Sequence, residues 1–83
     1  MRVLLAEDNA SLARATATIL TKSGLEVERA ADGGEALSML RGGFYDVAVL
    51  DIMMPVMDGL EVLRSIRAEG NSVPVIMLTA KTQ

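Results

Sequence analysis

Residues 46–59, DVAVLDIMMPVMDG, decide the fold of this chain. Segment 47–50 is an apolar, β-branched run that is too short for a helix and has no polar face, which predicts a strand buried on both sides. Such strands lie inside parallel sheets, which bind ligands at the carboxyl ends of their strands, and this run ends at Asp51. Pro55 then stops the strand, and Asp58 begins a turn that opens a helix. The order strand, acid, stiff loop and helix predicts a binding site at Asp51.

Other parts of the chain have the character of strands. Residues 3–6 are a second continuous apolar run, and it also ends in acids, Glu7 and Asp8. In residues 25–28 apolar and charged side chains alternate, which predicts a strand that is wet on one face and lies at the edge of a sheet. Residues 73–79 form the last predicted strand, in which a proline is tolerated near the start.

Three helices are predicted between these strands. Asn9 is placed to cap an amphipathic helix over residues 10–23, which stops at a glycine. Asp32 and Asp58 each precede a glutamate by three residues, the spacing of a capping box. The side chains at helical spacing that we expect to pack are Leu12, Ala15, Thr16, Ile19 and Leu20 in the first helix, Ala36, Leu37, Met39 and Leu40 in the second, and Leu60, Val62, Leu63 and Ile66 in the third.

The order of these elements, βαβαβαβ, predicts an α/β fold with a parallel sheet and right-handed crossovers. If the acidic ends of the first and third strands meet, those strands are neighbours and the sheet has the order 2-1-3-4. The first helix then lies alone on one face of the sheet, and the other two share the opposite face. The chain reverses direction between strands one and three, so a crevice lined by Glu7, Asp8 and Asp51 is expected there.

The amino-acid composition limits the classes of chemistry and of binding partner that the chain can have. The 83 residues make one small domain. The net charge of -3 does not indicate the positively charged surface that nucleic-acid binding requires. The chain has neither cysteine nor histidine, so chemistry must use carboxylates, hydroxyls, lysine or a metal. No apolar run approaches the length of a membrane span and the first residues do not resemble a signal peptide, so we expect a cytoplasmic protein with no membrane contact.

Three carboxylates at one edge of a sheet repel one another, and a bound cation would offset this repulsion. Two carboxylates about 6 Å apart repel by roughly 2–3 kcal/mol at an effective dielectric constant near 20. Mg²⁺ is the best candidate because it prefers oxygen ligands and commonly uses one or two carboxylates, waters and a phosphate. A carboxylate beside Mg²⁺ can act as a nucleophile toward phosphorus, and Thr79 would bring a hydroxyl near the phosphoryl oxygens.

Each of these residues also has a purely structural interpretation. Asp8 alone is equally well explained as a cap of the helix that follows it. Asp58 is better explained as a cap than as a ligand, since its turn and Glu61 account for it. Thr79 alone is weak evidence, because strands often end in threonine. The conjunction of these residues carries more weight than any one of them.

Three motifs in order, AEDN at residues 6–9, VLDIMMPVMDG at 49–59 and PVIMLTA at 74–80, together resemble the receiver domain of two-component response regulators. The resemblance covers the whole chain and implies a flavodoxin-like three-layer sandwich. It implies a partner histidine kinase that donates the phosphoryl group, and an output domain or downstream partner that responds. It further implies that the domain is no enzyme in its own right and catalyses only its own phosphorylation and dephosphorylation.

The resemblance also implies roles for single residues. Asp51 matches the phosphoacceptor, and Asp8, Asp51 and the backbone carbonyl of Met53 match ligands of Mg²⁺. Glu7 matches an acid that often acts through water, and Thr79 matches the switch hydroxyl. Met53 and Lys81 match positions that, in the family, flank the line of attack and influence how long the phosphoryl group stays on the acceptor.

The chain departs from the family at its end, because receivers have five βα units and this sequence stops after the fourth strand. The fifth strand carries the family's phosphoryl-binding lysine, and Lys81 is not that residue. The last strand, apolar on both faces, would be a sticky edge. We therefore expect a truncated receiver over residues 1–83, and a homodimer or swapped assembly through the fourth strand.

Two other functions compete with the signalling switch. An aspartyl-phosphate hydrolase would use the same nucleophile, but such enzymes commonly carry a second acid two residues later, where this chain has Met53. A truncated receiver that only oligomerises or competes for a kinase would fit the missing fifth unit.

Overall fold

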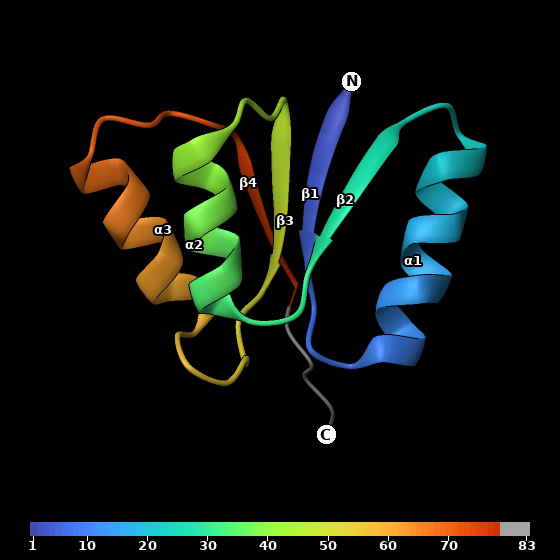
Figure 1. Cartoon of the computed structure of the whole chain (residues 1–83), viewed down its shortest axis with the longest axis horizontal. Helices are drawn as coiled ribbons and strands as arrows, with labels where there is room; N and C mark the ends of the chain where they lie inside the picture. The colour runs from blue at the N-terminus through green and yellow to red at the C-terminus, as the bar shows by residue number, and fades with distance from the viewer. Residues whose placement is uncertain (79–83) are drawn as a thin grey trace.

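The computed structural model describes residues 1–78, and it confirms the predicted alternation of strands and helices (Figure 1). The elements in chain order are β1 (Arg2–Ala6), α1 (Ala10–Lys22), β2 (Glu26–Ala30), α2 (Gly33–Gly42), β3 (Val47–Asp51), α3 (Gly59–Ala68) and β4 (Val75–Leu78). The four strands are parallel and have the order β2-β1-β3-β4, as predicted. Residues 79–83 lie outside the described part of the chain.

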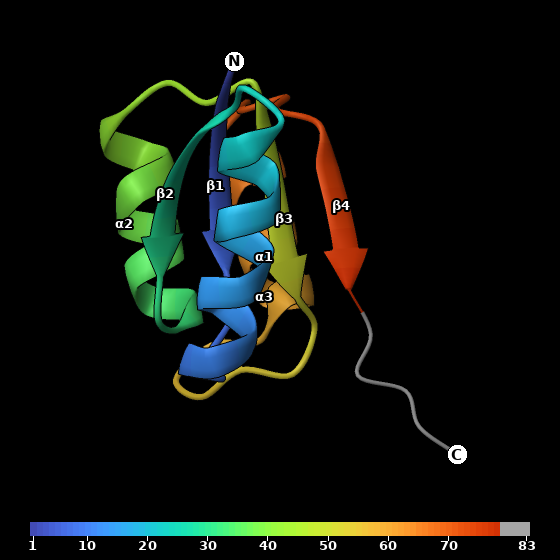
Figure 2. The ribbon, with the colours of Figure 1, turned by 90° about the vertical axis from the view of Figure 1, so that its right-hand side faces the viewer.

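The sheet is the middle of three layers. Helix α1 lies on one face, and α2 and α3 lie side by side on the other (Figure 1). This arrangement follows from the strand order: right-handed crossovers place helices on opposite faces when the chain moves in opposite directions along the sheet. Seen from the α1 side, β4 lies to one side of the helix, which does not overlap it (Figure 2). The predicted α/β three-layer sandwich is therefore confirmed.

The main core lies between the sheet and the pair α2 and α3. Alternate residues of β1 and β3 face these helices, and both Ala48 and Leu50 are fully buried. On the opposite face of β3, Val47 and Val49 are only half-buried. The prediction that residues 47–50 are buried on both sides is wrong for that face, because α1 alone does not cover it. The core residues on the α2–α3 side include Leu4, Ala6, Ala36, Leu37, Leu40, Ala48, Leu50, Val62 and Ile66.

Helix α1 packs differently from the sequence-based expectation. Leu12 is 50% exposed and Ile19 is 65% exposed, although both belong to the predicted packing face. The only fully buried residue of α1 is Ala13. Leu20, on the same predicted face, is half-buried, so the packing face is only partly as expected. Leu60, expected to pack in α3, is likewise exposed at 41%.

The starts of α2 and α3 test the predicted capping boxes. At α3 the box is confirmed, since the Glu61 N–H donates to Asp58 Oδ1 at 2.8 Å and the Asp58 N–H donates to Glu61 Oε1 at 3.0 Å. At α2 only half of it forms: the Glu35 N–H donates to Asp32 Oδ1 at 2.8 Å. The Glu35 carboxylate accepts instead from the Ala31 N–H at 2.7 Å, one residue earlier. The predicted reciprocal box at Asp32 is therefore wrong.

Strand β4 forms one side of the described sheet. It pairs with β3 and begins two residues later than predicted, directly after Pro74. The carbonyl of Pro74 accepts a hydrogen bond from the Ala48 N–H at 2.9 Å. Ile76, on the α1 side, is 53% exposed. Within the described residues, no helix has the length and apolar character needed to cross a membrane.

Candidate metal centre

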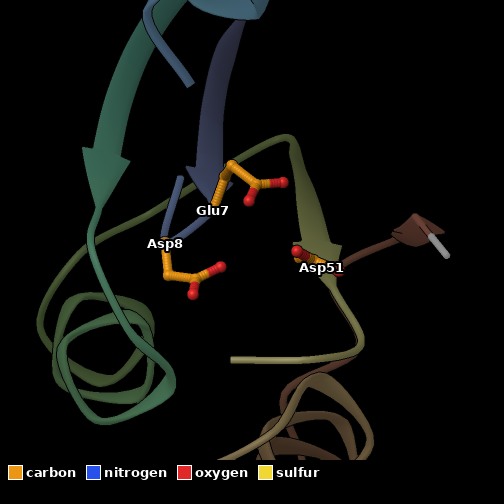
Figure 3. Close-up of side chains that lie close together, drawn as sticks. All are labelled: Glu7, Asp8 and Asp51. Carbon is orange, nitrogen blue, oxygen red and sulfur yellow. The ribbon is translucent and has the colours of Figure 1, made fainter. Parts of the chain in front are cut away.

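Three carboxylates meet at the carboxyl edge of the sheet. Glu7 and Asp8 follow β1, Asp51 ends β3, and these two strands are paired neighbours. Each of the three side chains offers an oxygen, and these oxygens all lie within 4.8 Å of one another. Glu7 and Asp8 extend toward Asp51 across the gap between the strand ends (Figure 3). The predicted meeting of these acids at the chain reversal is confirmed.

Glu7 is fixed by its own backbone and by the start of α1. Its N–H donates to the carbonyl of Ala30 at 3.2 Å, which continues the pairing with β2. Its Oε2 accepts from the Asn9 N–H at 3.0 Å, and Asn9 also caps α1 by accepting from the Leu12 N–H at 3.0 Å. Only 5% of Glu7 is exposed. Burial raises the pKa of its carboxyl; the Asn9 N–H opposes this and the nearby Asp51 adds to it.

The start of α3 packs against the backbone of Asp51 and holds this residue in place. A Cβ at Gly59 would lie 2.5 Å from the carbonyl oxygen of Asp51, so only glycine allows the helix to start this close to the strand. The Gly59 N–H donates to the carbonyl of Ile52 at 2.9 Å. The side chain of Asp51, 5% exposed, accepts at Oδ1 from the Met53 N–H at 3.2 Å. The Asp-Gly pair at residues 58–59 therefore caps α3 and also holds the acid in place.

A cavity of about 550 Å³ opens above the acids. Its lining combines acidic and apolar side chains, namely Glu7, Asp8, Asn9, Leu12, Asp51, Met53 and Leu78. Met53 is 71% exposed at its rim. Leu12 and Leu78 are not among the residues predicted for this site: Leu12 was expected on the packing face of its helix, and no pattern distinguishes Leu78 within its strand. Thr79 follows Leu78 directly, but it lies outside the described residues.

The donor set fits a hard divalent cation. All three side chains offer carboxylate oxygens, and the chain contains no histidine or cysteine that would favour a transition metal. Two unit charges 4.8 Å apart repel by about 3.5 kcal/mol at an effective dielectric constant near 20. A cation bound among the three acids would replace this repulsion by attraction. Mg²⁺, which keeps waters and binds phosphate as well as carboxylate, suits an open site of this kind.

Comparison with known proteins decides the family. The family model of the response regulator receiver domain matches residues 3–83. The chain belongs to this family. Receiver domains are the receiving modules of two-component systems and bind Mg²⁺ at an acidic pocket. The described residues of this chain contain a cluster of three acids, Glu7, Asp8 and Asp51.

Transcriptional regulators are among its curated relatives. The receiver is 43% identical over 83 residues to the transcriptional regulatory protein DltR of Streptococcus agalactiae, covering 100% of this chain and 37% of DltR. It is 46% identical over 82 residues to the transcriptional regulatory protein TctD of Salmonella typhimurium, covering 99% of this chain and 37% of TctD. The chain thus spans little more than a third of the length of these relatives.

Solved receivers share the fold closely. The receiver domain of Francisella response regulator 1452 superposes with a TM-score of 0.94 at 36% identity, over 99% of this chain and 68% of that one. The response regulator TrrA of Thermotoga maritima, solved in complex with Mg²⁺ and BeF, superposes with a TM-score of 0.92 at 36% identity, over 98% of this chain and 70% of that one.

Proposed function

We propose that this receiver accepts a phosphoryl group on Asp51 from a histidine kinase in a reaction that requires Mg²⁺. The observation that carries the proposal is the acid cluster: three carboxylate oxygens within 4.8 Å of one another, with Glu7 and Asp51 buried at the edge of a parallel sheet. Such a cluster is costly without a cation, and a cation there brings a phosphate oxygen beside Asp51. Membership of the receiver family supports the same assignment.

The carboxylates of Asp8 and Asp51 and the backbone carbonyl of Met53 would hold the Mg²⁺, and Glu7 would act on it through water. Bound there, the metal supplies charge neutralisation for the group being transferred. The three acids lie at the ends of two adjacent strands, and backbone N–H groups hold the side chains of Glu7 and Asp51, so little reorganisation of these two is needed. Asp8 is exposed and accessible to solvent, and it is the acid best placed to exchange water for ligand.

In the transfer itself, an oxygen of Asp51 attacks the phosphorus of a phosphohistidine on the kinase. A P–O bond forms, the P–N bond breaks, and the electron pair goes to the imidazole nitrogen, which then takes a proton from solvent. The Met53 N–H, which donates to Asp51 Oδ1, keeps the carboxylate plane fixed and leaves Oδ2 as the attacking atom. The receiver thereby catalyses its own phosphorylation.

The proposal extends to the response. Thr79 would follow β4 toward the phosphoryl group as the switch hydroxyl, and an output domain or downstream partner in the cytoplasm would read the change. We propose that residues 1–83 act as one phosphoacceptor unit. Leu78, the last described residue, already lines the cavity above Asp51, which supports the assignment of Thr79.

A second candidate function is self-association. The described sheet ends at β4, whose Ile76 is 53% exposed, and α1 leaves the adjoining face of β3 half-covered. We propose that the 83-residue chain pairs as a homodimer or swapped assembly through the β4 edge. Size-exclusion chromatography with light scattering is expected to show a dimer at high protein concentration. A monomer at every concentration would refute the assembly and leave the phosphoacceptor proposal untouched.

The phosphoacceptor proposal is tested with acetyl phosphate and Mg²⁺, followed by intact mass spectrometry. We expect the mass of one added phosphoryl group in the wild-type chain, and none in Asp51→Asn or when EDTA replaces Mg²⁺. Asp46→Asn is the matched control, because Asp46 precedes β3 at its opposite end and its side chain accepts from the Arg2 N–H at 2.7 Å. An adduct that survives in folded Asp51→Asn, or no adduct in the folded wild type, would refute the assignment.

A further inference from the structure

Helix α1 and the edge strand β2 lie on the side of the sheet away from β4 (Figure 1). A basic pocket lies between them. It has a volume of about 350 Å³ and is lined by Arg14, Ala17, Thr18, Thr21 and Lys22 of α1 and by Arg29 of β2. The α1 residues recur at intervals of three and four, so they form one stripe along the helix. The exposed Leu12 and Ile19 do not belong to this stripe.

Strand alternation brings Arg29 to this pocket. Arg29 pairs in register with Leu5 of β1, and its neighbours Glu28 and Ala30 belong to the opposite face. Ala30 is buried in the core toward α2 and α3, and Glu28 accepts hydrogen bonds from Tyr45 and Arg2. The nearest acid along β2 is therefore turned away from the pocket and already occupied.

No carboxylate lines the pocket itself, although Arg29 also borders a neighbouring depression that acids line. Within residues 1–78 the only ion pairs are Arg2–Glu28 and Arg41–Glu69, and residues 79–83 contain no acidic side chain. Arg14, Lys22 and Arg29 thus supply 3 of the 8 cationic side chains of a chain whose net charge is -3. Like charges around one depression create a positive potential that attracts an anion.

We propose that this pocket binds the polyphosphate group of a small di- or triphosphate ligand. Two guanidinium groups present donor forks that match phosphate oxygens, and an ammonium group adds a third positive charge. Thr18 donates its hydroxyl to the Arg14 carbonyl at 2.9 Å, whereas Thr21 lines the pocket beside it and offers a further donor. The volume lies at the small end of the range of about 300–1,000 Å³ for small-molecule pockets. Its cationic lining and small volume suit a short polyphosphate, whose negative charge is concentrated in a small group.

The proposal does not depend on phosphorylation at Asp51. The same residue, Arg29, also borders a smaller depression of about 280 Å³ that Glu7, Asp8 and Glu35 line, so the two regions are adjacent on the surface. Without a divalent cation the acids repel a phosphate, and binding can be measured at the basic pocket alone. The experiment is therefore done in EDTA.

The test is a titration of the ¹⁵N-labelled 83-residue chain with pyrophosphate and with tripolyphosphate, followed by amide chemical shifts. We expect saturable shifts at Arg14, Thr21, Lys22 and Arg29, and tighter binding of tripolyphosphate. Arg29→Gln and Lys22→Gln should each weaken binding by about fivefold, the effect of removing one exposed ion pair at the strong end of its usual range. Arg64→Gln removes the same charge from α3, on the other face of the sheet, and should leave affinity unchanged.

A titration with a nucleoside triphosphate tests whether the pocket recognises the phosphate chain alone or a whole nucleotide. Affinity equal to that of tripolyphosphate would mean that the phosphate chain alone is recognised, and tighter binding would mean that the nucleoside adds contacts; both support the site. The proposal is overturned by shifts that do not saturate, or by shifts spread equally over α3. It is also overturned if Lys22→Gln, an exposed substitution that spares the fold, binds as tightly as the wild type.

Discussion

Replacing Glu7 by glutamine should stabilise the fold in the absence of Mg²⁺. Glu7 is 5% exposed, its carboxylate oxygen lies within 4.8 Å of oxygens of Asp8 and Asp51, and burial raises its pKa. Repulsion between two charges at this separation is about 3.5 kcal/mol at a dielectric constant near 20 and about 0.9 kcal/mol in water. The unfolded chain avoids this repulsion, so we expect Glu7→Gln to be more stable by about 1–3 kcal/mol. The amide of the new side chain keeps an oxygen that can accept from the Asn9 N–H.

The pH dependence of this effect has a definite sign. Because the pKa of Glu7 is raised in the folded state, its neutral form contributes stability below the pKa of an unfolded glutamate, about 4.3. That contribution is lost as the pH rises through the folded pKa. The stability difference between Glu7→Gln and the wild type should therefore grow from acid toward neutral pH. Mg²⁺ should shrink it, since the cation stabilises the wild type by binding the folded state.

Thermal and urea unfolding measure the effect. For a domain of this size each 1 kcal/mol corresponds to about 4–8 °C in melting temperature. Glu26→Gln is the control, because Glu26 is exposed on β2 and lies outside the acid cluster. A Glu7→Gln variant that is less stable than the wild type in EDTA at neutral pH would refute the reasoning. So would a gain that is the same with and without excess Mg²⁺.

Three further predictions follow from local packing and hydrogen bonds. Gly59→Ala should lose about 1–3 kcal/mol in urea unfolding, because its Cβ would lie 2.5 Å from a backbone carbonyl oxygen; Gly42→Ala, with open space around it, should lose nothing. Val56 has a φ of 71°, which is strained for a β-branched residue, so Val56→Gly should raise stability by roughly 1 kcal/mol, and a lower melting temperature would contradict this. Burial and the Glu28 carboxylate both raise the pKa of Tyr45, so Glu28→Gln should lower that pKa. Ultraviolet titration measures the pKa directly, because the chain has a single tyrosine and no tryptophan. An unchanged titration curve would show that Glu28 does not affect the pKa of Tyr45.

The acid cluster could be predicted because its causes are local in the sequence. Two apolar runs each end in carboxylates, and parallel strands bring their carboxyl ends to one edge. The strand order followed from the assumption that these acidic ends meet, and the rule of right-handed crossovers then assigned each helix to a face of the sheet. The capping box of α3 was also predictable, because its two hydrogen bonds join residues three apart, and it fixes Asp58 and Glu61 as observed.

Other features depended on how elements pack, and sequence periodicity did not decide them. Leu12 and Ile19 have helical spacing, yet they are exposed, and the buried residue of α1 is the small Ala13. Glu35 has the spacing of a capping box, yet its carboxylate accepts from the Ala31 N–H, which belongs to the residue before the cap. Val49 is apolar but half-buried, since one helix covers a face that spans four strands.

The sequence by itself determined the alternation of strands and helices, the acids at the strand ends and the family to which the chain belongs. The tertiary structure decided which side chains are buried, how Gly59 docks beneath Asp51, and which residues share a pocket. Arg29 lies seven residues beyond Lys22 in the chain, on a different element, and only their packing places both around one basic pocket. The physical reason is that periodicity fixes the direction of a side chain within its own element, whereas exposure and charge environment depend on what the neighbouring elements place against it.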